Sequence, residues 1–325
     1  MISNLTRKLS LMLLMAVGGA SVLGAITPAD LLKKGDESLK NGHYKQAVSF
    51  YAKGCELRNG VSCASLASMY EDGEGVEKSY PKAISYYKKG CELRNGVSCA
   101  SLASMYEDGE GVEKSYPQAI SYYKKGCELR NGVSCASLAS MYEDGEGVEK
   151  SYPKAISYYK KGCELKGAVS CSSLGYMYFK GMGVEKDYKQ AFEFSKQACT
   201  LKYGFGCHLV GYMYRDGKGI SKDLNQAFVF FKKGCHLKNA SSCASLGYMY
   251  ENGEGVEKNH RLALPFYAKG CHLKDESSCH NLGTMYYNGR GVEKDIAKAV
   301  TFYEQGCNLG FKDSCKALQE IKAKK

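Results

Sequence analysis

The nine residues CELRNGVSC at positions 55–63 place two cysteines eight positions apart. The same nine residues return at 91–99 and at 127–135, so the pair recurs every 36 residues. A fixed period of 20–50 residues is typical of solenoids and propellers, in which each repeat packs mainly on its neighbours. All sixteen cysteines of the 325-residue chain fall into such pairs: Cys55 and Cys63, Cys91 and Cys99, Cys127 and Cys135, Cys163 and Cys171, Cys199 and Cys207, Cys235 and Cys243, Cys271 and Cys279, and Cys307 and Cys315.

Each repeat predicts two helices. In the first, Cys63, Leu66, Ala67 and Tyr70 stand at i, i+3, i+4 and i+7, which is one face of a helix. Gly73 then suits a left-handed C-cap. The second helix is expected to begin at a residue whose side-chain oxygen accepts a hydrogen bond from a free backbone N–H. These predicted N-caps are Ser79, Ser115, Ser151, Asp187, Asp223, Asn259 and Asp295.

The repeat pattern predicts an all-α fold, a right-handed α-solenoid of antiparallel helix pairs, because no long strand-like alternation interrupts it. Residues 26–60 are expected to form a leading helix pair without an internal cysteine. Residues 61–310 are expected to form seven repeats of 36 residues. Residues 311–325 are expected to add a short capping helix.

Residues 1–25 predict a cleaved secretory signal peptide. Arg7 and Lys8 precede an apolar run that ends at Leu23, and small residues follow. The expected cut lies near Ala25, with Ala20 as the weaker choice. A membrane anchor is the alternative, although the apolar run is short for a membrane span. We therefore expect a secreted protein, periplasmic or extracellular, and an oxidising compartment agrees with so many paired cysteines.

The formal net charge is +11, and removal of Arg7 and Lys8 would leave +9. Such a charge can indicate nucleic-acid or membrane partners. Here lysine is spread over every repeat and interleaved with glutamate, which is typical of a solvated surface. We therefore expect neither a nucleic-acid partner nor a membrane span.

The repeat resembles a known family. Leu66-Ala67-x-x-Tyr70, Gly73-x-Gly75-Val76 and Ala83-x-x-x-Tyr87 resemble a Sel-one-like repeat, a relative of the tetratricopeptide repeat. Residues 28–54 resemble a plain tetratricopeptide repeat. With a cysteine pair in every repeat and a secretion signal, nearly the whole mature chain is similar to the Helicobacter cysteine-rich protein (Hcp) family. That resemblance implies penicillin binding and slow β-lactam hydrolysis, and it supplies no catalytic residue.

The cysteine pairs are expected to be disulfides between successive repeats. Cys55 ends one helix and Cys63 opens the next, and a tight turn at Asn59 and Gly60 makes these helices antiparallel neighbours. Closing so short a loop is worth about 2.5 kcal/mol in the chain-entropy model. Unpaired buried cysteines are one alternative, and zinc is another, although zinc sites use pairs two to four positions apart. We expect no metal and no cofactor.

A search for catalytic motifs finds S-x-x-K at Ser85, Ser121 and Ser157, and again at Ser79 and Ser151. In serine β-lactamases this spacing places a lysine beside the nucleophilic serine, but the companion S-D-N and K-T-G motifs are absent from the sequence. The first three serines are expected on the solvated side of their helix, and the other two as N-caps. No catalytic residue is assigned, and whether the chain is an enzyme stays open.

Ligands of such solenoids usually bind the concave face, which the first helices line. Positions 64, 68, 71 and 72 are expected to face inward. In the three near-identical repeats they are Ala, Ser, Glu and Asp, which predicts a small, flat, acidic spacer. In later repeats aromatic and polar residues replace them, which suits a ligand with rings and polar groups. The predicted groove residues are Tyr176, Phe179, Lys180, His208, Tyr212, Arg215, Tyr248, Asn252, His280, Tyr287 and Asn288, with Ser172, Asp216, Ala244, Glu251 and Thr284 at the remaining inward positions.

Two functions follow from this groove. One is weak β-lactam binding and hydrolysis, which the family resemblance implies. The other is a non-enzymatic binding module for a peptide, a cell-wall fragment or a host protein on the concave face. Ordinary drift of a surface after duplication is the alternative explanation of the aromatic residues.

Overall fold

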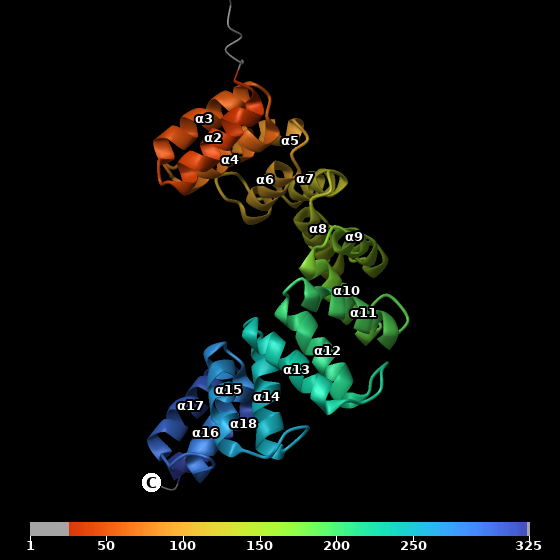
Figure 1. Ribbon diagram of the computed structural model, residues 1–325, viewed down its shortest axis with the longest axis vertical. Helices are drawn as coiled ribbons and strands as arrows, with labels where there is room; N and C mark the ends of the chain where they lie inside the picture. The colour runs from red at the N-terminus through yellow and green to blue at the C-terminus, as the bar shows by residue number, and fades with distance from the viewer. Residues whose placement is uncertain (1–25, 324–325) are drawn as a thin grey trace, which may run out of the picture. The chain divides into compact units, whose positions relative to one another are not determined.

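The computed structural model describes residues 26–323, and the predicted signal peptide lies outside them (Figure 1). All regular structure in that range is helical, and no helix there is long and apolar enough to cross a membrane. The helices are α2 (Pro28–Lys40), α3 (Tyr44–Glu56), α4 (Gly60–Asp72), α5 (Tyr80–Glu92), α6 (Gly96–Asp108), α7 (Tyr116–Glu128), α8 (Gly132–Asp144), α9 (Tyr152–Glu164), α10 (Ala168–Lys180), α11 (Tyr188–Thr200), α12 (Gly204–Asp216), α13 (Leu224–His236), α14 (Ala240–Asn252), α15 (His260–His272), α16 (Glu276–Asn288), α17 (Ile296–Asn308) and α18 (Lys312–Ala323).

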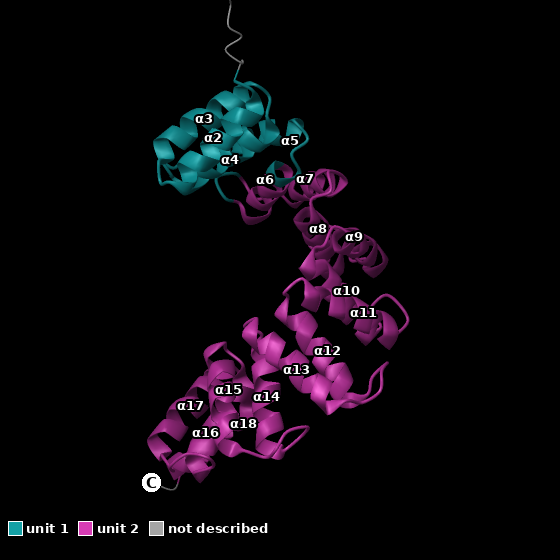
Figure 2. Ribbon diagram, in the orientation of Figure 1, with its two compact units in different colours: residues 1–98, 110–112 teal, residues 99–109, 113–325 magenta. Residues whose placement is uncertain are grey.

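The described residues form two compact units, one of residues 26–98 and 110–112 and the other of residues 99–109 and 113–323 (Figure 2). In the first unit, α2 packs on α3, α3 on α4 and α4 on α5. In the second unit, each helix from α7 to α17 packs on the helix that follows it. There the first helices of successive repeats, α8, α10, α12, α14 and α16, also contact one another. The predicted all-α repeat solenoid of antiparallel helix pairs is therefore confirmed.

The predicted helix ends are largely confirmed. Gly73 and Gly145 adopt left-handed conformations with φ of 76° and 81°, each at the C-cap of a first helix. The N-caps Asp187, Asp223, Asn259 and Asp295 accept the expected backbone hydrogen bonds.

Ser79, Ser115 and Ser151 also stand at the N-cap, as predicted, but the expected side-chain hydrogen bond was wrong for these three, because none is made. Their helices begin Tyr-Pro, and the proline has no N–H, so one backbone donor fewer needs a partner.

The turn between repeats contains a basic residue in the left-handed region. At the turn before α14, Lys238 has φ of 60°, and its N–H donates to the carbonyl of Cys235. Glycine is the usual residue in this conformation, so the sequence did not indicate it. The same conformation recurs at Arg58, Arg94, Arg130, Lys166, Lys202 and Lys274.

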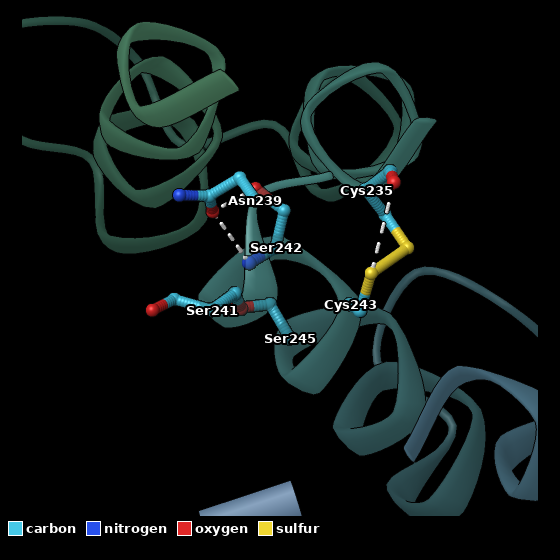
Figure 3. The surroundings of a disulfide bond; sticks show 6 residues. All are labelled: Cys235, Asn239, Ser241, Ser242, Cys243 and Ser245. Atoms are coloured by element: carbon cyan, nitrogen blue, oxygen red, sulfur yellow. Dashed lines mark hydrogen bonds between the residues drawn. A yellow bond between two sulfur atoms is a disulfide. The ribbon is translucent and has the colours of Figure 1, made fainter. Parts of the chain in front are cut away.

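Disulfides join successive repeats across these turns, as predicted. Figure 3 shows Cys235 at the end of α13 bonded to Cys243 in α14, with Cα atoms 4.7 Å apart. Asn239 caps α14 in the same turn, because its Oδ1 accepts from the Ser242 N–H at 2.8 Å. All sixteen cysteines lie in the described range, and none of them is free. The bonded pairs are 55–63, 127–135, 163–171, 199–207, 235–243, 271–279 and 307–315, and Cys91 and Cys99 are disulfide-bonded as well.

Candidate functional site

The acids near the end of the first helices are tied to buried tyrosines. The Tyr159 hydroxyl donates to Glu143 at 2.8 Å, and Tyr123 donates to Glu107 at 2.6 Å. Burial raises the pKa of Tyr159, and the hydrogen bond to Glu143 raises it further. The tyrosine hydroxyl at this position therefore occupies the glutamate carboxylate. The predicted acidic spacer of the three near-identical repeats thus offers a ligand fewer free carboxylates than its sequence suggests.

This pairing changes two repeats in a row. The position of Tyr159 becomes Ser195 and then Phe231 in the following repeats, and neither side chain carries a phenol. The matching acid becomes Phe179 and then Arg215. Because no tyrosine hydroxyl needs an acceptor there, the residues at the end of the first helix, Phe179 and Arg215, can make other contacts.

An aromatic–cationic cluster occupies the C-terminal ends of α10 and α12. Arg215 and Lys218 both lie over the Tyr212 ring, each 4.9 Å from its centroid. The Lys218 ammonium also donates to the Tyr212 hydroxyl at 3.1 Å. Phe179 meets the Tyr212 ring edge-on at 5.7 Å. We define this cluster as Tyr176, Phe179, Lys180, Tyr188, Tyr212, Arg215 and Lys218.

One carboxylate, that of Asp216, forms ion pairs with the cations Arg215 and Lys218 of the cluster. The Arg215 Nε donates to Asp216 Oδ1 at 2.8 Å. Burial alone would lower the pKa of Arg215 and raise that of Asp216, but their hydrogen bond reverses both shifts. The hydrogen bond with Tyr212 raises the pKa of Lys218. All three groups are therefore charged at neutral pH.

The cluster stands out electrostatically from the preceding repeats. At the positions of residues 215, 216 and 218, each of the three near-identical repeats has Glu, Asp and Glu. The next two repeats have Phe179, Lys180 and Met182, and then Arg215, Asp216 and Lys218. Cations at a helix C-terminus also face its negative dipole end, which stabilises them there. Two adjacent repeats thus change from acidic to basic.

A cavity of about 320 Å³ continues from the cluster toward α14. Arg215 and Asp216 form one side of it, and Tyr248, which is 44% exposed, forms another. Lys222 and Glu254 complete the lining. The structure thus brings together the predicted residues Tyr176, Phe179, Lys180, Tyr212, Arg215 and Tyr248 and adds Tyr188, Lys218, Lys222 and Glu254, which the inward-facing register omitted because they lie outside the first helices.

Two predicted groove residues lie mostly inside the protein. Phe179 is only 9% exposed, so its ring supports Tyr212 and Tyr188 rather than facing solvent. His208 packs between Phe205 and Phe231, and its Nδ1 is buried without a partner. Burial lowers the pKa of His208 to about 4, with Arg215 contributing.

The predicted residues on α16 make their contacts with neighbouring helices and the adjacent loop. His280 packs on Tyr303 and Phe311, with ring centroids 5.4 and 5.0 Å away. Thr284 shares a hydrogen bond of 3.1 Å with the Tyr303 hydroxyl. Asn288, like Asn252 on α14, donates its side-chain amide to a carbonyl of its own helix, and Lys294 lies 5.7 Å from the Tyr287 ring centroid.

One serine hydroxyl in the described part of the chain lies beside a histidine, at a buried position. Ser85, Ser121 and Ser157 are exposed on their helices, as expected. The Ser314 hydroxyl lies 3.1 Å from His280 Nδ1, but Ser314 is fully buried, so a substrate would not reach it. Within residues 26–323, no three His, Cys, Asp or Glu side chains are grouped to hold a metal ion.

The pattern of the Sel1 repeat matches seven consecutive segments: 60–95, 96–131, 132–166, 168–203, 204–239, 240–275 and 277–311. A solved protein of uropathogenic Escherichia coli, the protective antigen c5321 with an SLR fold, is 25% identical. Its TM-score is 0.73, and the match covers 92% of this chain and 68% of that one.

The chain is also related over part of its length to Helicobacter pylori Hcp proteins. HcpD of strain 26695, which is provisionally named a β-lactamase, is 48% identical over 79 residues. That match covers 24% of this chain and 26% of HcpD. β-Lactamase HcpA of strain J99 is 42% identical over 49 residues, which cover 15% of this chain and 20% of HcpA. The matched part therefore spans about a quarter of these relatives or less.

Proposed function

The chain belongs to the Sel1 repeat family, and on that premise we propose that it is an extracytoplasmic binding protein for an anionic ligand with a ring or sugar body. A fragment of cell wall is such a ligand, because its sugars and peptide carboxylates need apolar faces and cations together. Disulfides in successive repeats support an oxidising compartment, and the secretory segment predicted at residues 1–25 agrees with it.

One observation supports this proposal: two cations, Arg215 and Lys218, contact the Tyr212 ring at the point where the repeats change from acidic to basic. Arg215 uses Nε for Asp216 and keeps further N–H donors for a ligand. Its side chain is 26% exposed and that of Lys218 is 34% exposed, so both are accessible yet partly shielded from water. Partial shielding strengthens attraction to a carboxylate.

The test is titration of the oxidised protein with muramyl dipeptide by isothermal titration calorimetry. The double variant Arg215→Gln with Lys218→Gln should weaken binding at least tenfold. Lys232→Gln with Lys233→Gln removes the same charge from exposed positions on α13 and should leave binding unchanged. Equal losses of affinity in the two double variants would show that only the net charge of the protein matters, and would contradict the proposal.

A second pair of variants tests which of the predicted inward-facing positions bind the ligand. Tyr212→Ala with Arg215→Ala should weaken binding. Ser68→Ala with Ser104→Ala should not, because these serines donate to Asp72 and Asp108 on their own helices. Raising the salt concentration should weaken binding to the unmodified protein, since the cations are partly exposed.

β-Lactam recognition is a second candidate, favoured by the names of HcpD and HcpA. A penicillin carries a carboxylate beside a compact ring system, so the same cations could hold it. Hydrolysis of benzylpenicillin by the oxidised protein, followed by intact-mass analysis, tests this candidate. An acyl adduct on one serine, with turnover lost when that serine is replaced, would make the protein an enzyme. Background turnover, with benzylpenicillin displaced by muramyl dipeptide, would favour binding alone.

A further inference from the structure

The second helices α13 and α15 contain no acidic residue. Every other second helix of the described chain contains one, and these are Glu56, Glu92, Glu128, Glu164, Glu193 and Glu304. Four exposed cations lie on α13 and α15: Lys232, Lys233, Arg261 and Lys269. Within residues 26–323, none of these four cations forms an ion pair with a carboxylate. The alternation of lysine and glutamate that predicts a solvated surface therefore stops at these two helices.

The exposed face of α13 combines cations with an aliphatic side chain. Its residues stand at i, i+3, i+4 and i+7, which is one side of a helix: Val229, Lys232, Lys233 and His236. Val229 is 55% exposed. The opposite side of α13 is buried through Ala227 and Phe231, so the helix itself stays part of the fold while a partner meets the exposed face.

The exposed face of α15 has the same character. Leu262 is 46% exposed, and Arg261 and Lys269 lie on the same side of the helix. The position of Leu262 is lysine or glutamine in every other second helix of the described chain, and that of Val229 is serine in the three near-identical repeats. A single exposed aliphatic side chain is ordinary in a folded protein. Here two of them, on neighbouring helices, replace polar residues beside unpaired cations.

One tyrosine joins the two helices. Phe228 of α13 meets the Tyr250 ring edge-on with centroids 5.6 Å apart, and Phe266 of α15 stacks on the same ring at 5.5 Å. Both helices also pack on α14, which carries Tyr250. Because α13 and α15 hold equivalent places in successive repeats, their exposed faces adjoin. We define the α13–α15 patch as Val229, Lys232, Lys233, Arg261, Leu262 and Lys269.

The composition of the patch distinguishes between kinds of partner. A soluble polyanion would use the cations and leave Val229 and Leu262 in water. The surface of an anionic bilayer uses both kinds of side chain, because lipid phosphates attract the cations while aliphatic groups enter below the headgroups. The lack of acidic residues on both helices also matters, since a negative membrane surface repels carboxylates.

We propose that the α13–α15 patch docks the protein on the surface of a membrane that contains anionic phospholipids. Lys232, Lys233, Arg261 and Lys269 meet the lipid phosphates. Val229 and Leu262 enter the layer below them, and the buried sides of α13 and α15 keep both helices in the fold. This surface goes beyond the proposed function, because it shares no residue with the aromatic–cationic cluster.

The experiment measures co-sedimentation with vesicles of phosphatidylcholine and phosphatidylglycerol at a ratio of about three to one, and with vesicles of phosphatidylcholine alone. The protein is the oxidised mature chain from residue 26, which contains all the described helices and lacks the apolar residues 1–25. It should sediment with the anionic vesicles and stay in solution with the neutral ones. Equal binding to both kinds of vesicle would overturn the proposal.

A matched pair of variants tests the cations. Lys232→Gln with Lys233→Gln should weaken binding to the anionic vesicles about tenfold or more. Lys124→Gln with Lys125→Gln makes the same change at the equivalent positions of α7, where Glu128 follows, and should bind as the unmodified protein does. Equal losses in the two double variants would overturn the assignment to α13 and α15.

A second matched pair tests the aliphatic side chains. Val229→Ser with Leu262→Gln introduces residues that other repeats carry at these exposed positions, so it should fold and bind several-fold more weakly. Val133→Ser with Val169→Ser removes two exposed valines from first helices and should bind unchanged. Loss of binding in the lysine variant alone would overturn the membrane in favour of a soluble polyanion or an acidic protein.

A fluorescent probe gives an independent measurement. The sequence contains no tryptophan, so Leu262→Trp carries a single one. Its emission should shift to shorter wavelength on anionic vesicles and be quenched by brominated phospholipid, whereas Val133→Trp should show neither change. A bound protein with unshifted Leu262→Trp emission would overturn the proposal. Arg215→Gln with Lys218→Gln should keep vesicle binding, so failure of the proposed function and failure of this patch are distinguishable.

Discussion

Gly162 and Ser170 face each other across the crossing of α9 and α10 so closely that a Cβ on Gly162 would overlap the serine hydroxyl. Ser170 is fully buried, and the adjacent residues Cys163 and Cys171 form the disulfide. One repeat later the pair is reversed, because Ala198 faces Gly206, whose added Cβ would lie 2.6 Å from that of Ala198. The crossing has room for a side chain from one helix at a time.

Gly162→Ala should therefore destabilise the protein by about 1–3 kcal/mol, the usual cost of overpacking. Adding Ser170→Gly should recover most of that loss, because the double variant copies Ala198 and Gly206. Chemical denaturation of the three proteins measures the coupling. If the changes in unfolding free energy from Gly162→Ala and Ser170→Gly simply added, the two positions would not compete for the same space, and the prediction would be wrong.

Tyr159→Phe should cost about 1–3 kcal/mol, because it leaves the Glu143 carboxylate without its donor. The folded-state pKa of Tyr159 lies above its ordinary value. The contribution of the pair is thus fully present at neutral pH and is lost only as pH rises above about 10. Urea denaturation at pH 7 and at alkaline pH measures both effects. Tyr152→Phe, in a less buried tyrosine of the same helix, serves as the control.

The buried His208 predicts that the folded protein loses stability in acid. Its folded-state pKa of about 4 lies below the ordinary value of 6.5, so the stability it confers is present above pH 6.5 and is lost as pH falls toward 4. Arg215 depresses this pKa further, and Asp275 opposes the shift. His208→Ala, the residue found at this position in four repeats, should flatten that pH dependence by roughly 3 kcal/mol or less. An unchanged slope would contradict the assignment, and the exposed His236 supplies the control His236→Asn.

Replacing Cys235 and Cys243 together with alanine should destabilise the chain by about 2.5 kcal/mol, from the entropy of closing a short loop. Because each repeat packs mainly on its neighbours, the loss should concentrate on α13 and α14. Amide hydrogen exchange should increase there first. A uniform increase over α7 to α18 would indicate instead that the second unit unfolds as one cooperative body.

Lys238→Gly should stabilise the protein by up to about 1 kcal/mol. Lysine pays a steric cost at φ of 60° that glycine does not, although the freer unfolded chain offsets part of the gain. Lys232→Gly, within α13, should instead cost about 1 kcal/mol. Thermal denaturation of both variants measures the difference, and destabilisation by Lys238→Gly would show that its side chain makes a needed contact.

The sequence alone determined what is local or periodic. Cys63, Leu66 and Tyr70 follow the helical period, Gly73 ends a helix through its own backbone freedom, and the eight-residue cysteine spacing spans one tight turn. Each of these features depends on residues within one or two turns of the chain. For that reason the helix pairs, their order and their cross-links could all be predicted.

Only the tertiary structure decided which side chains meet across repeats. Tyr159 reaches Glu143 from the next helix, and Tyr176 reaches Phe205 from another repeat. Such contacts depend on how far each helix rotates about its axis, which packing of the whole stack sets. The same packing buried Phe179, which the inward-facing register had left exposed, and opened a cleft beside Ser140 on the surface predicted to be flat, because a space between helices appears in no single segment.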